Sequence, residues 1–320
     1  MQNSLLPQEF LLVHRRKFIN DTLKAAGLLA LAISPSLAFA NTLLNQRQYT
    51  VQQIIDLILK EGNLIPKKDT VDTLKSGKSD QIVTGIITTM FATITVIEEA
   101  IKLNANFIIA HEPTFYNHRD DIDWVKNNKV TAQKQALLDK HKIVIWRFHD
   151  YCHSLKPDAV SYGFARKAGW LPYYKSDEQM LTIPGMTLEK LAEYLKNKLG
   201  IRYVRFIGDP NQMCARIALF LGAPGGQRQV SLVEKENPDV LITGEAVEWE
   251  TVEYMRDSNL LGNKPAMLVL GHAASEDPGM EWFAEWLQTK LKEIKIKHIA
   301  SGDAFHLTMF KKERSGVNYV

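Results

Sequence analysis

The chain has 320 residues, of which 45% are hydrophobic, 23% charged and 9% aromatic, and its formal net charge is +3. This composition excludes a disordered or fibrous chain, and the length suits one large domain or two lobes. The nearly neutral charge argues against nucleic acid as the main partner, because the cations are in too small an excess over the anions to displace many phosphate counterions.

Residues 1–40 have the pattern of a cleavable export signal. Arg15 and Arg16 precede an apolar run over residues 25–33, and small residues at Ala38 and Ala40 suit a signal peptidase. The paired arginines resemble a twin-arginine signal, which predicts a periplasmic protein. Removal of this segment, with its four Lys or Arg and two Asp or Glu, would lower the net charge to +1. A lipoprotein or a retained N-terminal anchor stays open as the alternative, although the lack of a cysteine near Ala40 argues against lipidation.

Helical and strand periodicities alternate from Tyr49 onward, which is typical of an α/β sheet protein. A Pro- and Tyr-rich stretch interrupts the alternation, so we expect an N-terminal lobe over residues 41–169, a crossing segment over 170–186 and a C-terminal lobe over 187–320. The predicted helices cover residues 51–60, 94–103, 130–140, 159–168, 188–199 and 247–257, with another around 282–286. The predicted strands cover residues 82–87, 107–110, 143–148, 203–207, 216–221, 240–242, 266–270 and 295–300.

Three of the predicted strands are followed closely by a histidine, and acidic or histidine residues lie within four positions of each. In open α/β sheets, ligands bind beyond the carboxyl ends of the strands, and imidazole with carboxylate is a common donor set for zinc, iron or manganese. A lone histidine at a strand end is more often a capping residue, but the repeated pattern favours a metal site. The three histidines are His111, His149 and His272, and their neighbours are Glu112, Asp150, His153 and Glu276. We expect the remaining histidines to be surface or core residues: His14, His118, His141, His298 and His306.

Three other features have less specific signals. Glu245 follows a predicted strand and could be a general base, a partner that orients a ligating histidine, or a helix N-terminal carboxylate. The turn over residues 222–226 is rich in glycine but lacks a phosphate-loop pattern, so a plain turn is the preferred reading. Cys152 and Cys214 could form a bridge in an oxidising compartment, but nothing in the sequence shows that they meet.

Several segments resemble one known family. The segments FIIAHEPTFY, ITGEAVEWE and GHAASE, and the His-X-X-X-His loop after the third predicted strand, resemble the Nif-three-like proteins (NGG-one-interacting factor three). This family has a dinuclear metal centre, and its members are also labelled GTP cyclohydrolase I type 2 homologues. The resemblance implies two similar α/β lobes with mixed sheets facing a metal-binding cleft, one or two divalent ions, and a ring-shaped hexamer.

The resemblance also implies a ligand set. His111, His272 and Glu276 match the family pattern, whereas Glu112 stands where the family has a second histidine and His153 where it has an aspartate. The expected metal ligands are therefore these five residues, and the altered pair leaves the metal (Zn, Fe or Mn) and the number of ions open.

These features predict a metal-dependent hydrolase in which a bound ion activates water. Glu245, His149 and Asp150 would then handle proton transfer. The alternative is a non-catalytic metal-binding or scaffold protein. The substrate is not indicated. We expect no nucleic-acid partner, no stable membrane insertion after cleavage, and a homo-oligomer.

Overall fold

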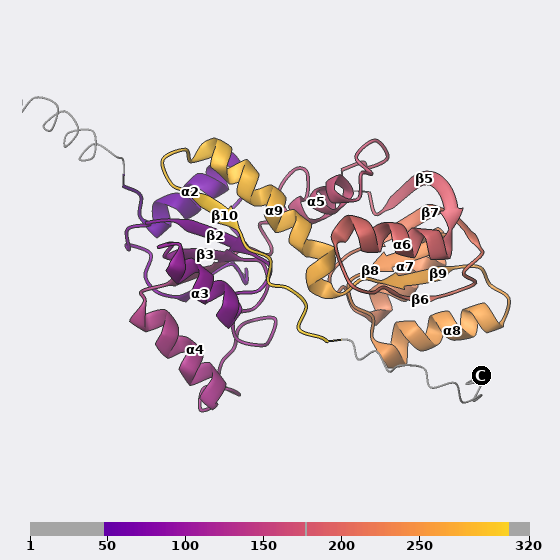
Figure 1. Ribbon diagram of the computed structural model, residues 1–320, viewed down its shortest axis with the longest axis horizontal. Helices are drawn as coiled ribbons and strands as arrows, with labels where there is room; N and C mark the ends of the chain where they lie inside the picture. Colours follow the sequence, from indigo (N-terminus) through magenta and orange to yellow (C-terminus); the bar gives the residue numbers. More distant parts are fainter. Residues whose placement is uncertain (1–47, 177, 307–320) are drawn as a thin grey trace, which may run out of the picture. The chain divides into compact units, whose positions relative to one another are not determined.

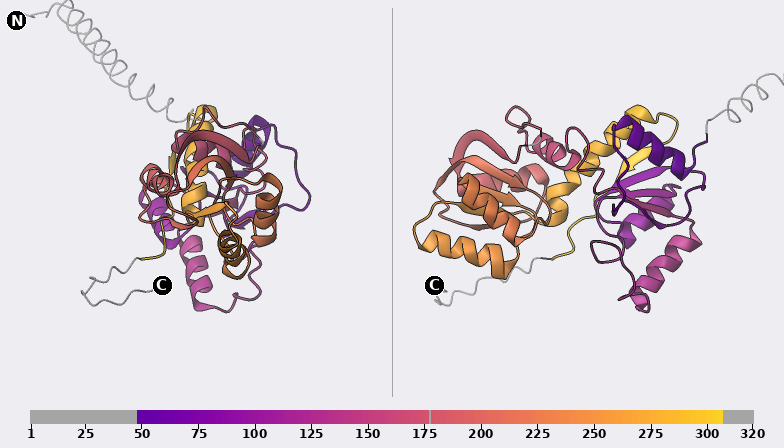
Figure 2. Two further views of the ribbon diagram at one scale, coloured as in Figure 1. Left: turned by 90° about the vertical axis from the view of Figure 1, so that its right-hand side faces the viewer. Right: turned by 180° about the vertical axis from the view of Figure 1, so that it is seen from behind.

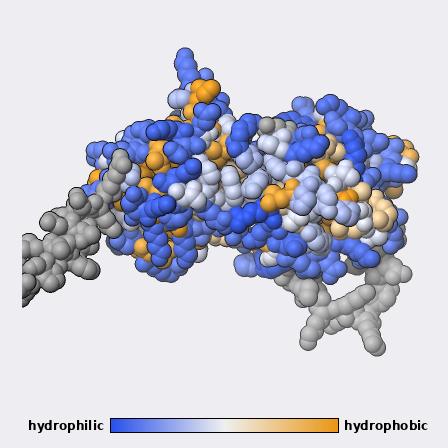
Figure 3. All heavy atoms as spheres, turned by 90° about the horizontal axis from the view of Figure 1, so that it is seen from above, coloured by the Kyte–Doolittle hydropathy of each residue, from blue (hydrophilic) through white to orange (hydrophobic). Residues whose placement is uncertain are grey.

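Two five-stranded mixed sheets organise the fold in the computed structural model, which describes residues 48–176 and 178–306 (Figure 1). The predicted export signal and its two arginines lie outside these residues. Within the described part of the chain, no helix has the length and apolar character needed to cross a bilayer. On the face drawn in Figure 3, hydrophilic residues predominate and hydrophobic residues occur in separate groups.

The first sheet has the strand order β1-β4-β3-β2-β10. Its three central strands are parallel, β10 is parallel to β2, and β1 runs antiparallel to β4. Because β2, β3 and β4 share a direction, their carboxyl ends lie along one edge of the sheet. The strands are β1 (Leu74–Ser76), β2 (Ile86–Thr89), β3 (Phe107–Ala110), β4 (Val144–Arg147) and β10 (Ile296–His298).

Helices cover both faces of the first sheet, which explains why its central strands are apolar throughout. Side chains alternate between the two faces of a strand. Ile86 therefore packs with α2 (Val51–Glu61) and α9 (His272–Lys290), whereas Ile87 packs with α3 (Ile94–Lys102) and α4 (Lys129–Lys140). The Thr50 side chain accepts a hydrogen bond from the backbone N–H of Gln53 and so begins α2.

The second sheet has the order β5-β7-β8-β9-β6, with β7, β8 and β9 parallel and both edge strands antiparallel. Helices α5 and α6 pack on one face, and α7 and α8 pack on the other. The strands are β5 (Met180–Thr187), β6 (Arg205–Ile207), β7 (Met213–Phe220), β8 (Val240–Thr243) and β9 (Ala266–Val269). The helices are α5 (Ala159–Lys167), α6 (Leu188–Leu199), α7 (Gly226–Glu236) and α8 (Glu253–Leu260), and a π-helix (Glu248–Val252) precedes α8.

Two glycines allow α5 and α9 to pack very closely (Figure 2). A Cβ atom on Gly163 would lie 2.4 Å from the backbone oxygen of Pro278, and a Cβ atom on Gly279 would lie 2.7 Å from the Cα of Val160. Real Cβ atoms do not approach other atoms so closely, so no larger residue fits at this crossing without a shift of the backbone. This contact sets the distance between the loop that precedes α5 and the first turns of α9.

The predicted α/β fold with mixed sheets is confirmed, and most predicted elements appear within a few residues of their expected bounds. Three differences stand out. Part of the stretch expected to be a crossing is the edge strand β5, which is irregular between Thr182 and Met186, where Pro184 lacks an N–H for the ladder. The short strand β1 was not predicted. The helix expected over residues 247–257 begins as a π-helix. Both cysteines are free and buried.

Candidate metal centre

The polar side chains expected at the strand ends do gather at one place. His111 and Glu112 directly follow β3, and His149 follows the neighbouring parallel strand β4. His272 is the first residue of α9, and Glu276 lies one turn later on the same face of that helix. The packing of α9 on β2 and β10 brings its first turns to the edge where β3 and β4 end.

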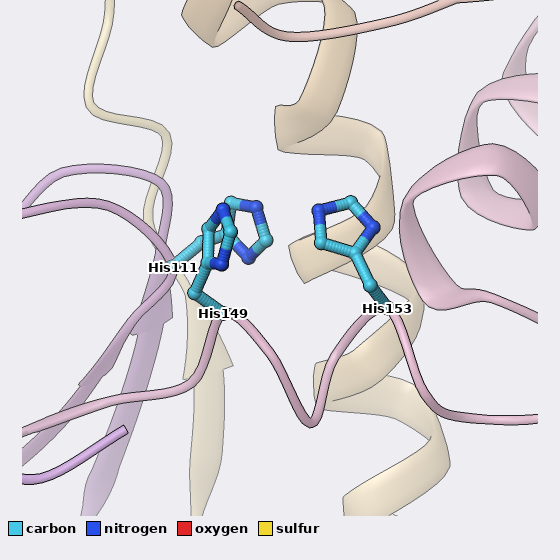
Figure 4. A group of neighbouring side chains, drawn as sticks. All are labelled: His111, His149 and His153. Atoms are coloured by element: carbon cyan, nitrogen blue, oxygen red, sulfur yellow. The ribbon is translucent and has the colours of Figure 1, made fainter. Parts of the chain in front are cut away.

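Three histidines form the first group of potential ligands. The rings of His111 and His149 are stacked with centroids 4.8 Å apart, and the ring of His153 lies 5.1 Å and 5.0 Å from them. Figure 4 shows the His153 ring turned toward the other two from the opposite side. One nitrogen from each ring lies within 4.8 Å of the other two, a spacing that a single metal ion could bridge.

Carboxylates and a fourth histidine form a second group beside the first. His111, Glu112 and Glu276 also have ligand atoms within 4.8 Å of one another. The Nε2 atom of His272 lies 3.1 Å from Glu276 Oε2 and 3.5 Å from Glu112 Oε1. His111 Nε2 lies 3.4 Å from Glu276 Oε2, and His149 Nε2 lies 3.6 Å from Glu112 Oε1.

These separations fit the demands of a small divalent cation. Ligand atoms at the corners of a tetrahedron around zinc are roughly 3.3 Å apart. The separations of 3.1 to 3.6 Å bracket that value. His111 gives a further indication, because its buried Nε2 atom makes no well-oriented hydrogen bond among the described residues, although Glu276 Oε2 lies 3.4 Å away. A buried polar atom is rarely left without a partner, and a metal ion would satisfy it.

All four histidines are oriented by a hydrogen bond at the same ring nitrogen. In each ring, Nδ1 meets an oxygen acceptor, which keeps a proton on Nδ1 and turns Nε2 toward the centre. Histidine ligands of metals commonly have such partners. The acceptors are the Phe148 carbonyl for His111 (3.1 Å), Asp150 for His149 (3.0 Å), Asp158 for His153 (3.0 Å) and Glu245 for His272 (2.9 Å).

The groups influence one another's protonation strongly. Burial lowers the pKa of His149 to about 4, with a contribution from nearby His111, so this ring is neutral at neutral pH. Burial also disfavours a charge on His272, but its carboxylate partners outweigh that effect and raise its pKa to about 12. Burial alone would raise the pKa of Glu276, yet His111 and His272 hold it well below its ordinary value. In the protein without a metal, the charge on His272 therefore balances part of the carboxylate charge.

The structure brings together all eight site residues expected from the sequence, and it refines their roles. Asp150 and Glu245 contact histidine Nδ1 atoms, which favours the orienting role among those that the sequence left open for Glu245. His149 lies in the group of three imidazoles rather than apart from it. His118, expected to be an ordinary surface or core residue, has its ring centroid 5.4 Å from that of His149. No spacing rule predicted this contact, because a long loop carries His118.

Asp72 is a second residue that the sequence did not identify. Its carboxylate accepts hydrogen bonds from the backbone N–H groups of His149 (2.8 Å), Asp150 (3.1 Å) and Tyr151 (2.7 Å). In return, Asp150 accepts a hydrogen bond from the Thr70 hydroxyl at 2.8 Å. The segment just before β1 therefore holds the loop that carries His149. Little in the sequence indicates this role, because Asp72 and Thr70 lie just before β1, a strand that was not predicted.

The glycine-rich turn before α7 serves packing. Gly222 has φ +68°, and a Cβ atom there would lie 2.1 Å from Glu276 Oε1, so glycine leaves the space that the Glu276 carboxylate occupies. A Cβ atom on Gly226 would lie 1.9 Å from a carboxylate oxygen of Glu250, which therefore lies over the N-terminus of α7. The reading of this segment as a turn agrees with both contacts.

Comparison with known proteins decides the family. The sequence model of the family described as Duf34/NIF3 (NGG1p interacting factor 3) matches residues 54–304. The chain belongs to the Duf34/NIF3 family. The resemblance read from the sequence segments is thus confirmed.

Curated Duf34/NIF3 relatives are similar over most of their length. A Clostridium acetobutylicum protein named "GTP cyclohydrolase 1 type 2 homolog" is 25% identical over 252 residues, covering 75% of this chain and 90% of the relative. An Escherichia coli K12 protein of the same name is 25% identical over 207 residues, covering 63% of this chain and 78% of the relative.

Solved structures share the Duf34/NIF3 fold. A hypothetical protein of Staphylococcus aureus aligns with a TM-score of 0.65 at 18% identity, covering 81% of this chain and 99% of that one. A Bacillus cereus protein related to NIF3 aligns with a TM-score of 0.63 at 16% identity, covering 82% of this chain and 100% of that one. At these identities the likeness concerns the fold alone.

Proposed function

We propose that this Duf34/NIF3 protein is a metal-dependent hydrolase with one or two divalent ions, of zinc, iron or manganese, at the centre described above. The observation that carries the proposal is the common orientation of the four imidazoles: each has Nδ1 on an acceptor, and the Nε2 atoms of His111, His149 and His272 lie close to Glu112 or Glu276. Such an arrangement requires four separate acceptors, and a purely structural cluster of histidines has no need of it.

The chain's own residues would divide the work. His111, His149 and His153 would hold one ion, and Glu112, Glu276 and His272 a second or shared one. A bound divalent ion lowers the pKa of water and so supplies a nucleophile near neutral pH.

Proton transfer falls to a residue that contacts both the centre and the solvent. Glu245 accepts a hydrogen bond from His272 Nδ1 at 2.9 Å, and its side chain is 59% exposed. The contact with His272 holds the pKa of Glu245 below its ordinary value, although burial opposes the effect. Glu245 is therefore ionised at neutral pH. It would pass a proton between the centre and the solvent in addition to orienting His272, although its lowered pKa makes it a weak base.

Elemental analysis tests the metal centre. We expect the purified chain to hold divalent metal, and the double variant His272→Ala, Glu276→Ala to lose most of it. His141→Ala is the matched control, because His141 ends α4 and belongs to neither group of ligands. An unchanged metal content in the double variant would remove the proposal.

Activity is a separate question from metal content. The assay uses GTP and other nucleotides, phosphoesters and peptides, each with Zn, Mn or Fe. GTP is included because the relatives are named GTP cyclohydrolase 1 type 2 homologues. Turnover that disappears in the double variant supports a hydrolase. A protein that binds metal but leaves every substrate intact would instead have the non-catalytic or scaffold function.

We further propose that the chain is exported by the twin-arginine route and assembles as a homo-oligomer. Export rests on Arg15 and Arg16 in the sequence, and assembly rests on the family resemblance. The variant Arg15→Lys, Arg16→Lys should remain in the cytoplasm, and an unchanged periplasmic yield would refute export. Sedimentation of the purified protein should give a mass several times that of one chain, and a monomer would refute assembly.

A further inference from the structure

A buried arginine, Arg147, contacts Glu112, one of the candidate metal ligands. The Arg147 side chain is fully buried at the end of β4. Its Nε atom donates to the His111 carbonyl at 3.2 Å, and one terminal nitrogen donates to Glu112 Oε2 at 3.2 Å. The other terminal nitrogen donates to the His118 carbonyl and lies 3.6 Å from Asp120 Oδ2. All three guanidinium nitrogens therefore have partners.

Because of the contact with Arg147, the two carboxylate oxygens of Glu112 have different neighbours. Oε2 accepts from Arg147, whereas Oε1 lies 3.6 Å from His149 Nε2 and 3.5 Å from His272 Nε2. Because the guanidinium is planar and its neighbours fix it on three sides, Oε2 is not free to turn toward the histidines. Glu112 presents a single oxygen to the centre, between one histidine of each ligand group.

We propose that Arg147 is a positioning residue that makes Glu112 a one-oxygen ligand and so selects the cation. This inference rests on the metal centre of the proposed function. A carboxylate that offers one oxygen suits four-coordinate ions such as zinc, whereas larger ions such as manganese or calcium gain from both oxygens. Arg147 thus favours a small cation with few ligands.

A purely structural role for Arg147 makes a different prediction. If Arg147 only held the loop over residues 111–120, its replacement would lower the stability of the protein and weaken the binding of all cations alike. If Arg147 limits Glu112 to one oxygen, its replacement changes the ratio of affinities between cations. Selectivity therefore separates the two roles, and stability alone does not.

The test measures zinc and manganese affinity by competition with a chromophoric chelator in Arg147→Lys and Arg147→Met. We expect the ratio of zinc to manganese affinity to fall at least tenfold in both, in the range typical for residues that orient ligands. Cobalt-loaded protein should show a change from a four-coordinate absorption spectrum to one of higher coordination. The matched control is Arg166→Lys. Arg166 also donates to a carboxylate, that of Glu285 at 2.6 and 3.2 Å, but this pair lies on the surface.

A second variant keeps the inference testable if the Arg147 variants fail to fold. In Glu112→Gln, the amide oxygen is the only atom that can accept from Arg147, so the amide nitrogen faces His149 and His272 and binds no metal. We expect Glu112→Gln to lose as much zinc affinity as Glu112→Ala. Zinc affinity close to that of the wild type in Glu112→Gln, or an unchanged zinc to manganese ratio in folded Arg147 variants, would overturn the inference. A wild-type protein that binds no metal would instead overturn the proposed function.

Discussion

Replacement of Asp72 by alanine tests whether the segment before β1 holds the histidine loop in place. The Asp72 carboxylate accepts the backbone N–H groups of His149, Asp150 and Tyr151 at 2.7 to 3.1 Å and is only 6% exposed. A buried N–H group left without an acceptor costs about 1–3 kcal/mol. In Asp72→Ala, the buried N–H of Tyr151 and the partly buried N–H groups of His149 and Asp150 lose their acceptor together, so the loop should lose its fixed shape.

Burial of the carboxylate offsets part of that loss. Burial raises the pKa of Asp72 above its ordinary value even though three backbone N–H groups oppose the rise, so the ionised carboxylate is itself unfavourable in this position. We therefore expect a net loss of about 2–4 kcal/mol in the free energy of unfolding. For a protein of this size the melting temperature should fall by about 3–7 °C. Asp72→Asn keeps one acceptor oxygen and should lose less.

The assay pairs thermal unfolding of metal-free protein with zinc affinity. Zinc affinity should fall by about 10- to 100-fold in Asp72→Ala, because His149 loses its orientation, and Asp72→Asn should lie between this variant and the wild type. Asp56→Ala is the control, since Asp56 is exposed on α2 and should change stability by about 0.5 kcal/mol or less. Wild-type melting temperature and zinc affinity in Asp72→Ala would refute the reasoning.

Three further predictions concern packing, pH and ligand orientation. Gly279→Ala should cost about 1–3 kcal/mol and weaken metal binding, because the new Cβ would lie 2.7 Å from the backbone of α5. Gly185→Ala should be nearly neutral by chemical denaturation, because its closest contact would be the flexible end of Met213 at 3.2 Å. Burial lowers the pKa of Lys134 from 10.5 to about 8, so the unfolded chain holds this proton to higher pH than the folded one. The unfolding free energy should therefore rise between pH 8 and 10.5, by roughly 3 kcal/mol more in the wild type than in Lys134→Met. Parallel curves of unfolding free energy against pH for the two proteins would contradict this. Glu245→Ala should weaken zinc binding about 10- to 100-fold and Glu245→Gln less, because glutamine can still accept from His272 Nδ1; equal losses would count against an orienting role.

The helices and strands could be predicted from the sequence where their buried apolar residues follow a clear periodic pattern. The four-residue strand over residues 107–110 and the helix over 188–199 have the predicted bounds, because an unbroken apolar run and a clear helical repeat each leave a single way to bury the apolar face. β1 has only three residues and no such pattern, so its place depends on pairing with β4. β5 contains Pro184 and reads as a loop, and only the free edge beside β7 allows it to be a strand.

The candidate site could be predicted in its residue types but not in its contacts. His111, His149 and His272 follow apolar strands, and the common direction of the strands is enough to bring such residues to one edge. The hydrogen-bond acceptors of the histidine Nδ1 atoms could not be predicted in this way. Asp158 lies at the start of α5, and the partner of His111 is a main-chain carbonyl. A main-chain carbonyl has no sequence signature at all. These contacts become visible only when the loops have a defined path.

The centre depends on helix packing as much as on its ligands. His153 lies shortly before α5, and Glu276 lies on α9, so the distance between them follows from the approach of these two helices at Gly163 and Gly279. A helix with a larger residue at either glycine would lie farther away, and a cation held at about 2 Å from each ligand atom tolerates little displacement. The glycines therefore constrain the ligand geometry without touching a ligand.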